Sequence, residues 1–208
     1  MRVIAFSLML ILFDQLLYSQ AVANFELLSL SENSFYLVCS GSNQKQGLIA
    51  EQFNTSDKNA THVGIGVVEE NVLTIYNVNN DQGENSALTV EDFKSFTSDR
   101  DFRYCSIWEY KSTRKEIRKL TKLLRSQLSK EIVFDMDFDV SNNKLYCSEF
   151  CSQMLNRWNP RSFAFGLTQK KLDSFYSKAL SREILYYFPV DFFQVNLKFK
   201  KIYEVFQQ

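Results

Sequence analysis

Short apolar runs separated by polar segments recur along the chain, and their lengths predict several strands. Four runs rich in β-branched and aromatic residues read as strands: Phe35–Cys39, His62–Val68, Val72–Val78 and Tyr104–Tyr110. Only Glu69–Asn71 separates the second run from the third. Because such a short polar link suits a tight turn, we expect these two strands to pair as a hairpin.

Two longer segments have the periodicity of helices instead. Between Thr113 and Ser129, apolar residues recur every three or four positions with Lys and Arg between them, namely Ile117, Leu120, Leu124 and Leu128. We interpret the basic residues as a solvated helix face. A second helix is expected from near Leu145 to just before Asn159-Pro160, with Asn142 or Asn143 as its cap.

Two further segments are assigned by shorter patterns. A short helix is expected around Val90–Phe96, after a loop rich in Asn, Asp and Gly. The aromatic segment Tyr186–Phe193 is strand-like. Together the elements predict an α+β fold in which an antiparallel sheet packs on helices. With no linker or repeat apparent, we expect one domain over residues 24–208.

The N-terminal residues have the pattern of a secretory signal. Met1-Arg2 gives a positive start, Val3–Phe13 is apolar, and Ala21-Val22-Ala23 resembles a signal-peptidase site. An uncleaved anchor would need about 18 apolar residues in a row, which this run lacks. We therefore expect a signal peptide over residues 1–23, no stable membrane span after its cleavage, and a periplasmic or secreted mature protein.

Composition and charge exclude several classes of partner. The chain has 45% hydrophobic and 15% aromatic residues among its 208, which is typical of a folded globular protein. Lys plus Arg and Asp plus Glu balance at 24 each. No net field therefore draws the protein to nucleic acid or to an anionic membrane.

The cysteines and aspartates do not form a metal motif. No CxxC pair occurs, and the spacing of Asp135, Asp137 and Asp139 fails as a calcium loop, since Val140 and Tyr146 stand where Gly and Glu are needed. Cys39 and Cys105 are interpreted as small buried hydrophobic residues in preference to a disulfide pair. Accordingly, we expect neither a metal nor a cofactor.

A candidate for nucleophilic catalysis combines a lone histidine with a cysteine. His62 is the only histidine, and Cys147 falls in the first turn of the helix predicted near Leu145. Unpaired N–H groups and the positive end of the helix dipole lower a thiol pKa there, and a nearby imidazole completes the activation. The alternative is a buried structural cysteine with an unrelated strand-end histidine.

The segments around these two residues resemble a known family. Thr61-His62-Val63-Gly64-Ile65 followed at a distance by Tyr146-Cys147-Ser148-Glu149-Phe150 is similar to the permuted papain-like family typified by YiiX, a branch of the NlpC-type superfamily. The resemblance extends from about Phe35 to Phe193. It implies a circularly permuted papain-like fold in which the histidine precedes the cysteine.

The resemblance also implies roles for individual residues. Cys147 would be the nucleophile and His62 the base, with a third polar residue on the next strand to orient the imidazole. Asn77 is the first choice for that residue and Asn79 the second, because alternation places both on one strand face. Family members often carry an acidic residue there and a Gly-Asp pair on the first core strand, and this chain departs from both patterns.

Two residues beside the nucleophile are left with two interpretations each. Tyr146 either lines the cleft or packs, and Glu149 is either catalytic or structural. The implied function is an exported cysteine peptidase or amidase that hydrolyses a small peptide or amide, by analogy one derived from the cell wall. The alternatives are a lipid acyltransferase or thioesterase of the same superfamily, and a non-catalytic exported binding module.

Overall fold

The computed structural model describes residues 25–26, 28–44, 50–80, 86–98 and 101–206. The predicted signal peptide, residues 1–23, lies outside the described residues. Among the described residues, no helix is long and apolar enough to cross a bilayer.

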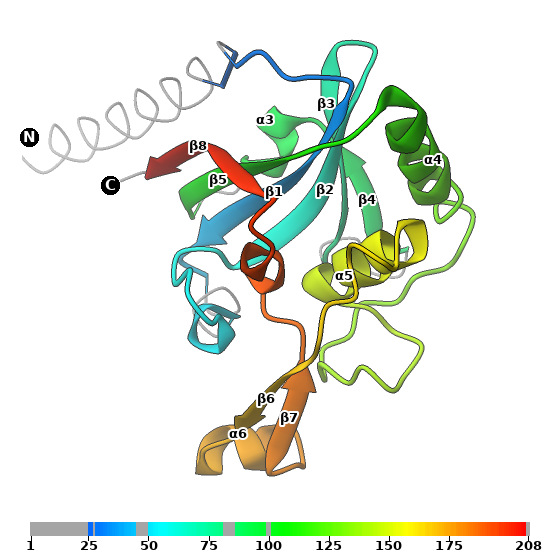
Figure 1. The fold of residues 1–208 in the computed structure, drawn as a ribbon. Helices are drawn as coiled ribbons and strands as arrows, with labels where there is room; N and C mark the ends of the chain where they lie inside the picture. The colour runs from blue at the N-terminus through cyan, green and yellow to red at the C-terminus, as the bar shows by residue number, and fades with distance from the viewer. Residues whose placement is uncertain (1–24, 27, 45–49, 81–85, 99–100, 207–208) are drawn as a thin grey trace, which may run out of the picture.

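An antiparallel sheet of six strands forms the centre of the molecule, in the order β4-β3-β2-β1-β5-β8 (Figure 1). Every neighbouring pair is antiparallel, as the sequence predicts. The turn between β2 and β3 holds Glu70 and Asn71 at positive φ, which is the geometry of a tight hairpin. The strands are β1 (Ser34–Ser42), β2 (His62–Glu69), β3 (Val72–Val78), β4 (Leu88–Glu91), β5 (Phe102–Lys111) and β8 (Lys200–Phe206).

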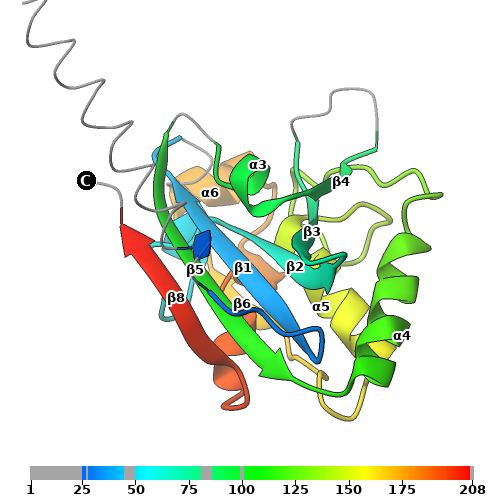
Figure 2. The ribbon, with the colours of Figure 1, turned by 90° about the horizontal axis from the view of Figure 1, so that it is seen from above.

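Helices pack on both sides of this sheet, and most of them lie on one side (Figure 2). The amphipathic helix forms as predicted but ends earlier, at Arg125, where Ser126 caps it. Leu128 therefore lies outside the helix and is exposed. The helices are α3 (Phe93–Phe96), α4 (Arg114–Arg125), α5 (Cys147–Trp158), α6 (Ser174–Ala179) and the 3₁₀ helix η1 (Phe192–Val195).

Three local predictions were wrong. Val90 lies in β4, where it pairs with Tyr76, so the predicted helix is reduced to α3. The strand-like segment Tyr186–Phe193 ends as a strand at Tyr187 and turns into η1. The cap of α5 is Tyr146 and not Asn142 or Asn143, because the Asn142 side chain accepts from the N–H of Lys144 in a turn of its own.

The two faces of the sheet carry separate apolar cores. Leu37, Val63 and Ile65 point to the larger core, which α4 and α5 cover. Tyr36 and Ile75 point to the smaller core on the opposite face, beside α3. Where the strands are paired, alternation therefore decides which side chains can meet α5.

The same alternation settles the pairing of two cysteines. Cys39 faces the larger core and Cys105 the smaller one, although they lie on neighbouring strands. All four cysteines are free and buried. The interpretation of Cys39 and Cys105 as small buried hydrophobic residues is confirmed.

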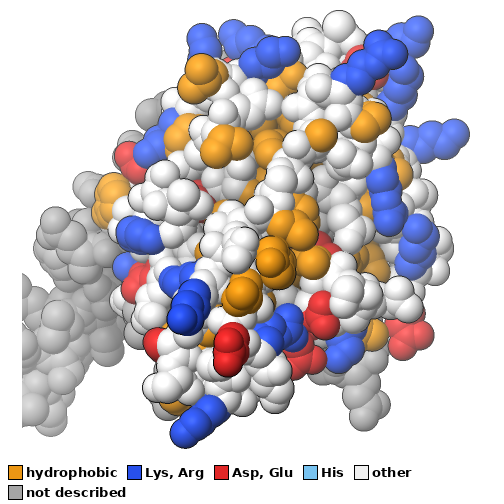
Figure 3. Space-filling model, turned by 60° about the horizontal axis from the view of Figure 1, so that its bottom comes forward, with side chains coloured by type: hydrophobic (Ala, Val, Ile, Leu, Met, Phe, Trp, Pro, Cys, Tyr) orange, Lys and Arg blue, Asp and Glu red, His pale blue; other side chains and the backbone are white. Residues whose placement is uncertain are grey.

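A small unit made of β6 (Thr168–Lys171), α6 and β7 (Ile184–Tyr187) projects from the sheet (Figure 1). Its inner side builds a third core with Tyr146, which lies next to Cys147 in the chain. Its outer side leaves Phe175 and Tyr186 exposed. This end of the molecule comes forward in Figure 3, where hydrophobic side chains lie among charged ones.

Candidate functional site

His62 opens β2 and is held by Asn77 of the neighbouring strand. The ring Nε2 and the Asn77 Oδ1 lie 3.0 Å apart, so the amide oxygen accepts the Nε2 proton. Asn77 is fully buried, which makes this hydrogen bond costly to lose. With Nε2 occupied, Nδ1 is the ring nitrogen left to face another partner.

The strands beside the imidazole separate at this point. The ladder between β2 and β3 ends at Ile65 and Tyr76, although β2 continues to His62 alongside β1. Gly64 lets β2 and β3 stay close together beyond the end of the ladder, since a Cβ at this position would lie only 3.0 Å from the Cβ of Asn77. The imidazole therefore sits where the sheet opens and can be approached from both faces.

Each face supplies one neighbour to the imidazole. Phe96 of α3 stacks on the ring from the smaller core, with centroids 5.4 Å apart. Cys147 of α5 belongs to the larger core and hydrogen-bonds to His62. Figure 1 shows α5 lying against β2, the strand that His62 opens.

Cys147 is the first residue of α5, so the helix begins two residues later than predicted and Cys147 lies in its first turn as expected. Tyr146 precedes it in extended conformation and makes no side-chain cap, and the N–H of Ser148 in the first turn faces the Cys147 sulfur instead. Burial raises the pKa of the thiol, but His62 and the N–H groups of Val63 and Ser148 outweigh it, and the pKa of Cys147 lies below its usual range.

The imidazole responds in the opposite direction. Burial lowers the pKa of His62, but the Cys147 sulfur, the Asn77 hydrogen bond and the charge of Glu91 together raise it above the ordinary value. A lowered cysteine pKa beside a raised histidine pKa favours a thiolate paired with an imidazolium. The arrangement can attack a carbonyl carbon and deliver a proton to a leaving group.

Residues on either side of Cys147 hold the unit formed by β6, α6 and β7. The Phe188 N–H donates to the Tyr146 hydroxyl at 2.8 Å, and the Ser148 hydroxyl donates to the Phe188 carbonyl at 2.7 Å. Tyr146 is buried and its ring packs against Phe138. Both flanks of Cys147 are thereby fixed to the end of β7.

Glu149 is buried in the first turn of α5, two residues after Cys147. Burial and the Asp135 carboxylate raise its pKa to about 7, although Gln153 and the Tyr146 N–H oppose the rise. Gln153 donates to one carboxyl oxygen at 3.1 Å, and the other oxygen, Oε2, has no hydrogen-bond partner among the residues that the structure describes. These contacts are those of a helix-start residue that reaches back to the cap.

Of the residues singled out in the sequence, the structure brings together Cys147, His62 and Asn77. Asn79 lies two residues after Asn77 in the chain. Its amide nitrogen is 3.4 Å from the Asn77 side-chain oxygen and 3.4 Å from the Thr89 hydroxyl. It therefore supports Asn77 from the next position on the same strand face.

Sequence reasoning missed three contributors. Phe96 gave no signal, because its stacking depends on how α3 crosses the sheet. Ser148 lies in the motif segment and Cys151 directly after it, but neither of them was assigned a role from the sequence. Their signal is the spacing of Cys147 and Cys151 by four, which places two sulfurs on one helix face.

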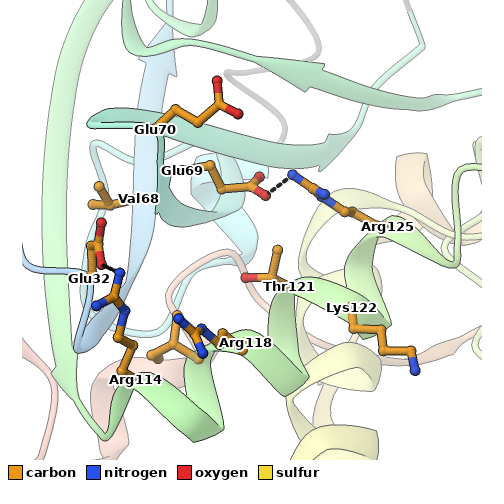
Figure 4. Close-up of a pocket in the computed structure, with 10 residues that line it drawn as sticks. Glu32, Val68, Glu69, Glu70, Arg114, Arg118, Thr121, Lys122 and Arg125 are labelled. Atoms are coloured by element: carbon orange, nitrogen blue, oxygen red, sulfur yellow. Dashed lines mark hydrogen bonds and ion pairs between the residues drawn. The ribbon is translucent and has the colours of Figure 1, made fainter.

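A cavity of about 440 Å³ lies elsewhere, between the β2–β3 hairpin and α4 (Figure 4). Ion pairs between Arg125 and Glu69 and between Arg114 and Glu32 cross it. None of the candidate catalytic residues lines it. The cavity is therefore separate from the cysteine–histidine site.

Comparison with known proteins yields a fold relationship. No family model matches the chain, and no curated protein matches it. Among solved structures, it is similar to a protein described as the metalloprotein YiiX from Escherichia coli, with a TM-score of 0.60 and 14% sequence identity. The match covers 85% of this chain and 99% of that one. The YiiX-like α+β fold is thus shared.

Proposed function

We propose that this protein is a cysteine hydrolase that cleaves an amide bond through a Cys147 acyl-enzyme. The observation that carries the proposal is the connected contact of Cys147, His62 and Asn77, drawn from α5, β2 and β3. The shifts in the pKa of Cys147 and of His62 point toward the ion pair that such chemistry needs.

The reaction would proceed in two halves. The Cys147 thiolate attacks the substrate carbonyl carbon, and the carbonyl π electrons move to oxygen to give a tetrahedral oxyanion. As the oxyanion collapses, the C–N bond breaks and the imidazolium of His62 donates its proton to the departing amine. Water then attacks the thioester while His62 accepts a proton, and collapse releases the acid and restores the thiolate.

The proposed hydrolase has a permuted papain-like fold and is exported. A permuted papain-like fold is supported by the chain order, with the histidine strand before the cysteine helix. Export follows from the signal-like residues 1–23, and it would place the enzyme in the periplasm or outside the cell. Small peptides or amides, including those derived from the cell wall, are the substrate class by fold analogy.

A metal has no part in this mechanism. The similar solved protein is described as a metalloprotein. Among the residues that the structure describes here, no group of three or more His, Cys, Asp and Glu side chains could hold a metal ion. The site offers one thiol, one imidazole and one amide, which suits covalent catalysis better than a closed metal site.

The test is the pH dependence of iodoacetamide labelling at Cys147 in the purified protein, compared with His62→Ala. Cys105, which is buried and whose pKa burial raises, is the internal control. Fast labelling well below about pH 7 that is lost in His62→Ala is expected. Labelling that follows an ordinary thiol near about pH 8.5, unchanged in the variant, would leave a binding module as the function.

A positive result is followed by a substrate screen with matched amides and acyl esters. Turnover of amides supports the hydrolase. Transfer of acyl chains between lipids, with no amide turnover, would assign the acyltransferase alternative to the same thiol.

A further inference from the structure

Where the ladder between β2 and β3 ends, the main-chain groups of Val63 face α5. Val63 lies past the last paired residues of that ladder, Ile65 and Tyr76, while it remains in register with Cys39 of β1. Its side chain enters the larger core. Without β3 opposite, its main-chain N–H and carbonyl need other partners, because buried backbone groups are rarely left unpaired.

Two cysteine sulfurs of α5 provide those partners. The Val63 N–H donates to the Cys147 sulfur, and the Cys151 sulfur donates to the Val63 carbonyl oxygen at 3.7 Å. The two cysteines are four residues apart and so share one helix face. One residue of β2 is thus held at both polar groups by the nucleophile and by the cysteine one turn later.

We propose that Cys151 is a positioning residue: its S–H anchors the Val63 carbonyl, which keeps the Val63 N–H directed at the Cys147 sulfur. The inference rests on the proposed function, since it assigns a task at the same thiolate. A thiolate accepts hydrogen bonds, and a fixed N–H donor stabilises it without reorganisation.

The chemistry of Cys151 suits a permanent donor. It is fully buried, and burial together with the neighbouring Cys147 raises its pKa well above the usual value. Cys151 therefore keeps its proton while Cys147 loses one. The alternative is that Cys151 only fills space in the core. In that case the reactivity of Cys147 depends on the volume of residue 151 and not on a hydrogen-bond donor there.

Variants of Cys151 separate donation from volume. Cys151→Ser keeps an X–H donor, whereas Cys151→Ala and Cys151→Val remove it, the valine without leaving a cavity. The readout is the pH profile of iodoacetamide labelling at Cys147, located by mass spectrometry. Cys105→Ala, which removes a buried thiol facing the other core, is the matched control.

We expect Cys151→Ala and Cys151→Val to slow labelling below about pH 7 by roughly tenfold, as loss of one hydrogen bond would do. Cys151→Ser and Cys105→Ala should retain the wild-type profile. If alanine does not fold, valine alone decides the comparison with serine. A wild-type profile in valine, or equal slowing in valine and serine, overturns the positioning role.

The two proposals fail in different ways. If labelling of the wild type does not depend on His62, the proposed function fails, whatever the Cys151 variants do. If it depends on His62 but not on a donor at residue 151, the hydrolase stands and the positioning role alone is lost.

Discussion

Glu149 should make the protein less stable as pH rises from acid to neutral. Its carboxyl is buried, its pKa is raised from an ordinary 4.5 to about 7, and its Oε2 lacks a partner. The unfolded chain ionises this group first. Stability is therefore unaffected below the unfolded pKa, is lost between the two pKa values, and stays lost above about pH 7.

The size of the effect follows from the two pKa values of Glu149. They differ by about 2.5, and each pH unit corresponds to about 1.36 kcal/mol, so the penalty is about 3 kcal/mol in unfolding free energy. Glu149→Gln cannot ionise and has nearly the same shape. The stability of the variant minus that of the wild type should therefore rise by about 3 kcal/mol between about pH 4 and pH 8.

Urea denaturation of both proteins across this range is the assay. The difference between them cancels the titration of all other groups. A companion variant, Gln153→Ala, removes the N–H that donates to the carboxyl at 3.1 Å and lowers its pKa. Without this hydrogen bond the pKa of Glu149 rises further. The loss of stability with rising pH should therefore continue to higher pH in Gln153→Ala than in the wild type. A variant-minus-wild-type difference that is flat with pH would refute the account of Glu149.

Three other substitutions test the contacts that hold His62 and the segments next to it in place. Asn77→Ala removes the acceptor of His62 Nε2, so labelling of the nucleophile below about pH 7 should slow about tenfold in an iodoacetamide assay; unchanged labelling would rule out an orienting role. Asp191→Ala removes a buried carboxylate that accepts from the three N–H groups of Thr55–Asp57, and should cost about 2–4 kcal/mol by urea denaturation. Gly64→Ala adds a Cβ 3.0 Å from that of Asn77, and thermal unfolding should report a loss of about 1–3 kcal/mol, whereas a neutral result would mean that the opening can widen freely.

The sequence predicted those parts of the site that local pattern controls. Cys147 could be placed at a helix start because apolar residues follow it at helical spacing. Alternation placed Asn77 and Asn79 on one strand face and left the order between them to their position in the run. The structure puts Asn77 against the ring because the ladder ends one residue before it.

The contributors that were missed depend on contacts distant in the chain. Phe96 meets His62 across the smaller core, and Cys151 meets Val63 only because β3 leaves that residue unpaired. Neither the end of a ladder nor the crossing of a sheet by a short helix leaves a periodic signal. Val90 was misassigned for a related reason: a strand of four residues is too short to show its period.

The bonds to Phe188 and Asp191 affect when the site can assemble as the chain is made. Phe188 fixes both flanks of Cys147, and Asp191 binds the loop that leads into His62. Cys147 and His62 thus both depend on residues about 40 and 130 positions later in the chain. A nascent polypeptide released before residue 191 would carry its cysteine and histidine without the contacts that fix them. Reactivity should therefore appear only after residue 191 has been made and can fold back onto this loop.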